Sequence, residues 1–357
     1  MLRAAYGIQL FFIISAIVIA ESYEARKQIE KHPAINFYIR RFFRIAPIFY
    51  FYILINFLVY GFGVRHQAPD GTNCFSYILT GLFLSGWHPT TINAAVDGAW
   101  SITGEIFFYL LFPLFYRRWF STKKILWLLI ITIVLNELII IFSIKYSHII
   151  SDISQKGINF FNINYLPSNF DRAYSILLSD FLYYWFPAQI PIFLMGCMCY
   201  KVIQWNRINP SIGKSYSPIL LSLAIIGMAL CSKGSFNRLP VHFVYGFFLS
   251  FFVLSIKFRR YAIIENRFIA FIGKRSLSLF LNHIILLDVY RRWLLGINPH
   301  FFINPHPLEL FAFLIGAFIT FMFAAEITYQ FFEKTGIRVG NYLAMLLELR
   351  AIKRCEN

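Results

Sequence analysis

The sequence predicts an all-α, polytopic integral membrane protein, a bundle of about nine spanning helices with one short re-entrant or interfacial segment. Of its 357 residues, 58% are hydrophobic and only 14% are charged, and the mean hydropathy is +0.61. A soluble fold has too little interior to hide so much apolar surface, so lipid must be part of the solvent. The 42 Phe and 21 Tyr residues suit helices with aromatic belts at the membrane interfaces.

The spans follow from apolar runs close to the length that crosses a bilayer. In chain order they cover residues 4–20, 45–62, 100–116, 125–143, 181–200, 217–231, 241–256, 277–290 and 308–328. A tenth run, 75–86, is too short to cross and is the expected re-entrant or interfacial segment. We expect residues 1–340 to form one membrane domain, followed by a short basic cytoplasmic tail at 341–357.

The distribution of charge sets the expected orientation. A net charge of +16 would suggest a nucleic-acid partner in a soluble protein. Here the basic residues lie in short loops between apolar runs, so we exclude nucleic acid and expect the lipid bilayer as the partner. With the loop 21–44 in the cytoplasm, 24 of the 33 Lys and Arg residues lie inside, as the positive-inside rule requires. This layout places Met1 outside, so either the N-terminus inserts outward or a helix precedes it.

Three arginines stand at the start of the second apolar run, in Arg40-Arg41-Phe42-Phe43-Arg44. A guanidinium group stays charged and matches phosphate oxygens with a planar fork of donors. The cluster therefore predicts a site for an anionic head group or a phosphorylated cofactor at the cytoplasmic face. A plain topological anchor is the alternative, because basic residues collect on the cytoplasmic flank of any membrane helix.

Two residues inside the predicted spans have the chemistry of catalytic groups. Glu105 lies just inside a helix start, where we expect Ser101 to cap the helix and Trp100 to anchor it at the interface. A carboxylate in a membrane marks function by default, although a capping contact or a buried arginine would also explain Glu105. His283 lies in a span near the C-terminus and is a candidate general base, with a hydrogen-bonded structural histidine as the alternative.

Other chemistry has less support. The five cysteines show no zinc or redox spacing, and no metal is expected. Protease, hydrolase, nucleotide-binding and dinucleotide-binding motifs are lacking from the sequence. The longest outer loop, about 144–180, carries aspartates, asparagines and aromatic residues that would suit a sugar, or it is only a solvated connector. His66 and His88 fall in outer loops and could touch an acceptor.

Five segments together resemble the acyltransferase family 3 membrane proteins, which include O-antigen and other surface-polysaccharide acetylases. Two segments depart from the family pattern, with Ala16 where a glycine is usual and Asn282 where a tryptophan is usual. In chain order, the segments are Gly7–Ser15, Phe37–Pro47, Trp100–Glu105 with Phe108–Pro113, Ser276–His283 and Tyr329–Glu333.

The resemblance implies acyl transfer from cytoplasmic acyl-CoA to a hydroxyl group of a glycan. Arg41 and Arg44 would hold the CoA phosphates with support from Arg40, and Glu105 and Trp100, with Ser101 beside them, would line the site. Family members usually open with a helix that carries an arginine and, about ten residues on, a histidine thought to be the base. This sequence starts after that helix, so His283 is the predicted catalytic histidine here, with Glu105 as its catalytic partner.

We therefore predict a multi-pass enzyme of the inner (plasma) membrane that transfers an acetyl group from acetyl-CoA. The predicted acceptor is a surface polysaccharide, such as the O-antigen of lipopolysaccharide, or its lipid-linked precursor. A polysaccharide polymerase or glycosyltransferase, a flippase of the same pathway, and an inactive N-terminally truncated acyltransferase are the alternatives. The sequence does not identify which particular glycan is the acceptor, the length of the acyl chain or the oligomeric state.

Overall fold

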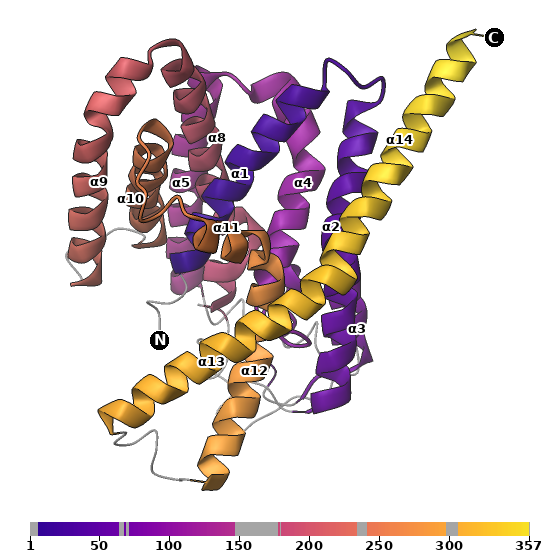
Figure 1. The fold of residues 1–357 in the computed structure, drawn as a ribbon, viewed down its shortest axis with the longest axis vertical. Coiled ribbons are helices and arrows are strands. Elements are labelled where there is room, and N and C mark those ends of the chain that lie inside the picture. Colours follow the sequence, from indigo (N-terminus) through magenta and orange to yellow (C-terminus); the bar gives the residue numbers. More distant parts are fainter. Residues whose placement is uncertain are drawn as a thin grey trace. The chain divides into compact units, whose positions relative to one another are not determined.

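The computed structural model describes residues 6–63, 68, 71–146, 178, 180–233, 241–297 and 306–356. These residues are helical or lie in turns, and they include no β-strand, which confirms the all-α prediction. The chain divides into two compact units, each described here by itself (Figure 1). Unit 1 comprises Met1–Pro33, Gly63–Ala94 and Ala99–Tyr261, and unit 2 comprises Ala34–Phe62, Ala95–Gly98 and Ala262–Asn357.

Each predicted span corresponds to a helix. The helices of unit 1 are α1 (Tyr6–Arg26), α3 (Cys74–Gly81), the 3-10 turn η2 (Ser85–Trp87), α4 (Ala99–Trp119), α5 (Thr122–Lys145), α8 (Phe186–Ile208), α9 (Pro210–Ser232) and α10 (Val241–Phe258). Those of unit 2 are α2 (Pro33–Tyr60), α11 (Arg267–Lys274), α12 (Ser276–Ile297), α13 (Pro307–Thr328), the π-helix η3 (Tyr329–Glu333) and α14 (Lys334–Glu356).

Within the described residues, seven helical stretches are long and apolar enough to cross a membrane. The pair α11 and α12, bent by 72°, makes an eighth if it counts as one span, and α10 is a shorter apolar helix. Together they occupy the nine predicted positions, so the chain is a membrane protein. The tenth run contains α3, which has only 8 residues and is indeed too short to cross.

The prediction of a loop at residues 21–44 is wrong for most of that range. Helix α1 continues to Arg26 and α2 already begins at Pro33, so the arginine cluster lies inside α2 and not before it. Proline is pre-organised for a first helical turn, and arginine is a good helix former, so nothing between residues 33 and 44 ends the helix. The second span is thus longer than its apolar core.

Helices α13, η3 and α14 form one continuous helical stretch, Pro307–Ala351, of 45 residues (Figure 1). At 1.5 Å per residue it is about 68 Å long, roughly twice the thickness of a hydrocarbon core. Part of it must therefore extend beyond the bilayer. The expected boundary between membrane domain and tail at 340/341 falls inside α14, and the division itself stays a prediction.

Small residues bring α1 and α8 into close contact in unit 1. A Cβ atom on Gly196 of α8 would lie 2.6 Å from the Ile13 carbonyl oxygen and 2.7 Å from Ala16 Cβ. Beside this contact the rings of Phe12 and Phe193 pack with centroids 4.5 Å apart. Helices without a glycine at this position could not approach so closely, which is how small residues act at membrane helix interfaces.

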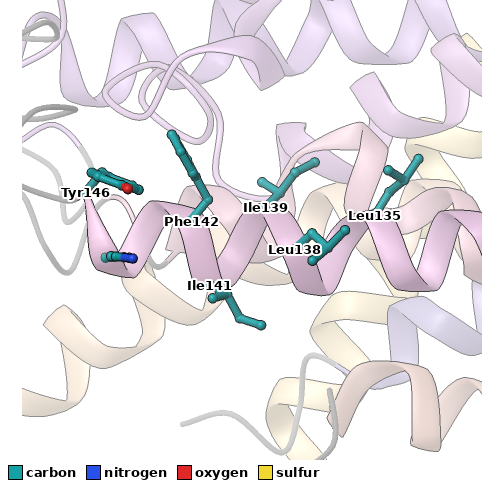
Figure 2. A pocket seen from close by; sticks show the side chains of 7 residues that line it. Leu135, Leu138, Ile139, Ile141, Phe142 and Tyr146 are labelled. Carbon is teal, nitrogen blue, oxygen red and sulfur yellow. The ribbon is translucent and has the colours of Figure 1, made fainter.

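Helix α5 presents an apolar face to its surroundings. Leu135, Leu138, Ile141 and Phe142 are each more than half exposed and, with Ile139, Lys145 and Tyr146, line a shallow hollow of about 540 Å³ (Figure 2). Such a surface is stable only in contact with lipid. We therefore assign the hollow to lipid contact and not to the candidate active site.

In unit 2, two glycines seat α14 against α2. A Cβ atom on Gly336 would lie 2.1 Å from the Phe43 carbonyl oxygen, and one on Gly340 would lie 3.0 Å from Phe43 Cβ. Pro47 lies inside α2 and has no N–H to donate to that carbonyl, so this helical hydrogen bond is missing. One turn further along, the rings of Phe51 and Phe332 stack at 4.3 Å. These contacts fix the segment of α2 that carries the arginines.

We expect Gly336→Ala to destabilise the protein by about 1–3 kcal/mol, because its methyl group has no room against the α2 backbone. The measurement is the thermal unfolding midpoint of the purified protein in detergent. Gly273→Ala is the matched control, since a Cβ there meets nothing within 4 Å and alanine favours the helix by about 0.5–1 kcal/mol. Equal midpoints for the two variants would show that α2 and α14 do not pack as described.

Candidate active site

Glu105 is a buried carboxylate held by two hydroxyl groups. Its side chain belongs to α4, and the residue is only 4% exposed. Ser15 Oγ of α1 donates a hydrogen bond of 2.7 Å to Glu105 Oε1, and the Tyr109 hydroxyl, one turn along α4, donates to the same oxygen. These bonds offset the cost of removing the carboxylate from water. Among the described residues its donors are thus hydroxyls, and not a capping N–H or an arginine.

The roles expected for the two neighbours of Glu105 are corrected. Helix α4 begins at Ala99, so Ser101 lies inside its first turn and does not cap it. Instead, Asn93 Oδ1 accepts a hydrogen bond of 3.4 Å from the Trp100 N–H. Trp100 is 3% exposed and packs edge-on against Phe12, so it is a core residue and not an interface anchor. The hydrogen bond at the start of this helix therefore comes from the loop before it. The local sequence pattern did not indicate this contact.

The three arginines share one side of α2. Residues 40, 41 and 44 fall within an arc of about 100° on a helix of 3.6 residues per turn. Arg41 is buried, with its guanidinium carbon 5.5 Å from the centre of the Phe37 ring. Arg44 Nε lies 4.0 Å from Oε1 of Glu333, which is 1% exposed. Arg44 is therefore oriented by a buried carboxylate, and the cluster has the positive charge that an anionic ligand requires.

Glu333 also joins the arginine segment to α12. Ser278 Oγ donates a hydrogen bond of 2.9 Å to Glu333 Oε2. Glu333 ends the π-helix η3, a rare geometry that is frequent at functional sites. Three of the five family segments thus meet around this carboxylate in unit 2, and the other two meet around Glu105 in unit 1.

A second polar contact links α2, α12 and α13. The Tyr52 hydroxyl donates to Asn282 Oδ1, and Asn282 Nδ2 donates a 2.9 Å hydrogen bond to Thr328 Oγ1. Asn282 is the residue that replaces the family's usual tryptophan, and here its amide uses both polar ends. These hydrogen bonds lie at the start of the π-helix, which follows Thr328.

His283 follows Asn282 on α12 and is partly buried. Its Nδ1 lies 2.5 Å from the Phe280 carbonyl oxygen, so we assign the ring proton to Nδ1. In the neutral imidazole this tautomer leaves Nε2 as the proton acceptor. This is the state a general base needs, although the same contact would hold a structural histidine. His283 belongs to unit 2 and Glu105 to unit 1, so each is described in its own surroundings.

The loop predictions are tested only in part. His88 Nδ1 contacts Thr90 Oγ1 at 2.9 Å, and burial lowers the pKa of His88, which keeps its ring neutral. His66 and the outer-loop residues 147–177 lie outside the described residues. Among the described His, Cys, Asp and Glu side chains, no group of three is placed to hold a metal ion.

Comparison with known proteins confirms the family resemblance. A family model described as an acyltransferase domain matches residues 2–326. The chain is also 31% identical over 129 residues to the acyltransferase MdmB of Streptomyces mycarofaciens, a match that covers 34% of this chain and 31% of that protein. No solved structure matches. Because the family match spans nearly the whole chain, this membrane protein belongs to acyltransferase family 3.

Proposed function

We propose that this enzyme transfers an acetyl group from cytoplasmic acetyl-CoA to a hydroxyl group of a surface polysaccharide or its lipid-linked precursor, in the inner (plasma) membrane. The observation that carries the proposal is the set of three arginines on one side of α2, held by Glu333 and by the close packing of α14. Membership of an acyltransferase family favours acyl transfer over the polymerase, glycosyltransferase and flippase alternatives.

The arginines account for binding of the donor. CoA carries phosphate groups, and guanidinium groups bind phosphate with paired, charge-assisted hydrogen bonds. Arg44 is partly exposed and can contact a ligand directly. Arg41 is buried and contributes its positive charge from the protein interior. Arg40 lies on the same side of the helix. The proposed orientation, with this segment at the cytoplasmic face, agrees with the source of acyl-CoA.

The transfer itself needs a base for the acceptor hydroxyl. In our proposal, Nε2 of His283 takes the hydroxyl proton as the acceptor oxygen attacks the thioester carbonyl. The carbon–sulfur bond then breaks, and the imidazolium returns the proton to the leaving CoA thiolate. In this scheme Glu105 is the buried charge in unit 1 that orients the hydroxyls of Ser15 and Tyr109. Trp100 and Ser101 lie beside it on α4.

Arg41→Ala and Arg44→Ala should each raise the Kd for acetyl-CoA by about tenfold to a hundredfold, the usual value of a charged hydrogen bond. Binding is measured by calorimetry on the purified protein in detergent. Arg44→Lys keeps the positive charge but removes the planar guanidinium group, so it tests whether paired hydrogen bonds to phosphate are required. Arg26→Ala is the control, because Arg26 is exposed and pairs only with Glu30 one turn away. Wild-type affinity in both alanine variants would remove the arginines from the donor site.

Glu105→Gln removes the negative charge with little change in size. We expect kcat for acetyl transfer to fall at least about tenfold, because the oriented hydroxyls lose their charged acceptor. The assay follows radiolabelled acetyl groups in membranes. Glu137→Gln is the matched control, since Glu137 is another carboxylate within a membrane helix, α5. Full transfer in both variants would make Glu105 a structural residue only.

His283→Gln should reduce acetyl transfer by about a hundredfold to ten-thousandfold, the contribution of a general base. Acetyl-CoA affinity should stay at the wild-type value, which separates loss of chemistry from loss of binding. His306→Gln serves as the control, because His306 caps α13 and is exposed. Retained transfer in a folded His283→Gln protein would mean that another group takes the proton.

A further inference from the structure

Of the deeply buried polar atoms in unit 1 that lack a hydrogen-bond partner among the described residues, three lie around Tyr183. They are Gln9 Oε1, Gln189 Oε1 and His242 Nε2. Both glutamines are 0% exposed and His242 is 6% exposed. Partnerless buried polar atoms are rare in native proteins, and a bound molecule or water is a common reason for them. We call these three residues, together with Tyr183, the neutral polar cluster.

The cluster is organised around Tyr183. Gln9 Nε2 donates a 3.2 Å hydrogen bond to the Tyr183 hydroxyl, and Gln189 Nε2 donates a 2.6 Å hydrogen bond to the Tyr183 carbonyl. The His242 ring lies 5.2 Å from the Tyr183 ring. The bond to the Tyr183 carbonyl fixes the Gln189 amide, because turning it over would place two acceptor oxygens against each other. The Tyr183 hydroxyl can donate as well as accept, so the Gln9 amide keeps the orientation that the structure assigns, with Oε1 left for a ligand.

One member of the cluster lies on a helix that also carries a family segment, and the helix of another family segment packs beside it. Gln9 lies on α1, six residues before Ser15, or about 9 Å along the helix axis. Trp100 of α4 has its ring 6.5 Å from Tyr183 and 4.6 Å from Tyr184. The polar atoms thus lie near aromatic rings, and Gln9 shares α1 with Ser15 of the Ser15–Glu105 contact.

The chemistry of the cluster defines its ligand. Two amide oxygens and one imidazole nitrogen can each accept a hydrogen bond, so the ligand must offer several donors, as hydroxyl groups do. The cluster contains no cationic side chain, and Asp180 is close enough to Tyr184 to act on it electrostatically. An anionic ligand such as the phosphate part of CoA is therefore disfavoured, and a neutral ligand fits.

We propose that the neutral polar cluster binds the hydroxyl groups of the acceptor, a neutral sugar residue whose apolar face lies against Trp100 and Tyr184. Gln9 and Gln189 each accept from one hydroxyl, and His242 accepts from a third. This inference deepens the proposed function and rests on it, since it assigns acceptor recognition to unit 1.

The test uses the full chain in detergent, with the methyl glycosides of glucose, galactose, mannose, rhamnose and N-acetylglucosamine as probes. Their binding is measured by saturation-transfer NMR titration. We expect at least one glycoside to bind, and its Kd to rise at least about tenfold in Gln9→Met and in His242→Phe. Gln204→Met is the matched control on α8, because the Gln204 amide already bonds Tyr200 and Lys201. It should leave the Kd unchanged.

His242→Phe also separates a binding role from a structural one. Its Nε2 has no hydrogen-bond partner among the described residues, so the variant should unfold at the wild-type temperature or above it while sugar binding is lost. Acetyl-CoA affinity is measured on the same samples. Glycoside binding that depends on the cluster, in a protein that binds no acetyl-CoA, supports the acceptor site and contradicts the proposed donor. Failure of every glycoside to bind, or equal binding in wild type and variants, overturns the inference and leaves internal water as the occupant.

Discussion

The fold depends on one constraint, that a polar group inside a lipid-embedded bundle must find its partner on another helix. Glu105 and Glu333 are the clearest instances. Each is almost fully buried, and each receives a serine hydroxyl from a different helix, Ser15 for the former and Ser278 for the latter. A carboxylate in that position restricts the rotation of both helices, because any other rotation would break the hydrogen bond between them. Polar residues thus determine which faces of otherwise apolar helices meet.

Hydropathy predicts where the helices are, because the bilayer imposes a length and a composition that can be read from a single chain. It does not predict where a helix ends beyond the bilayer. The arginines of α2 are a case in point, since they end the apolar run but not the helix. The same reasoning misplaced Trp100, because an aromatic residue beside a predicted helix start can equally well pack into the core, as it does here.

The partners of the site residues lie too far apart in sequence for local patterns to identify. Ser15 and Glu105 are 90 residues apart, and Ser278 and Glu333 are 55 apart. The family segments indicated which residues matter, whereas the coordinates show which of them meet. Gln9, Gln189 and His242 were missed altogether, although a glutamine or histidine in an apolar run carries its own signal. Such a side chain is costly in lipid unless something binds it.

The two candidate sites differ in charge in a way that suits the two proposed substrates. Electrostatic interactions are strong in the low dielectric of a membrane protein, so a site that binds an anionic donor must be cationic. The arginines of α2 meet that need. A neutral sugar substrate gains nothing from such charge. Uncharged groups that accept hydrogen bonds, as in the neutral polar cluster, recognise its hydroxyl groups better. If the acetyl donor and the sugar were bound by the same set of side chains, the arginines would compete with the sugar for the polar groups of that set. Separate linings allow each substrate to be selected by its own chemistry.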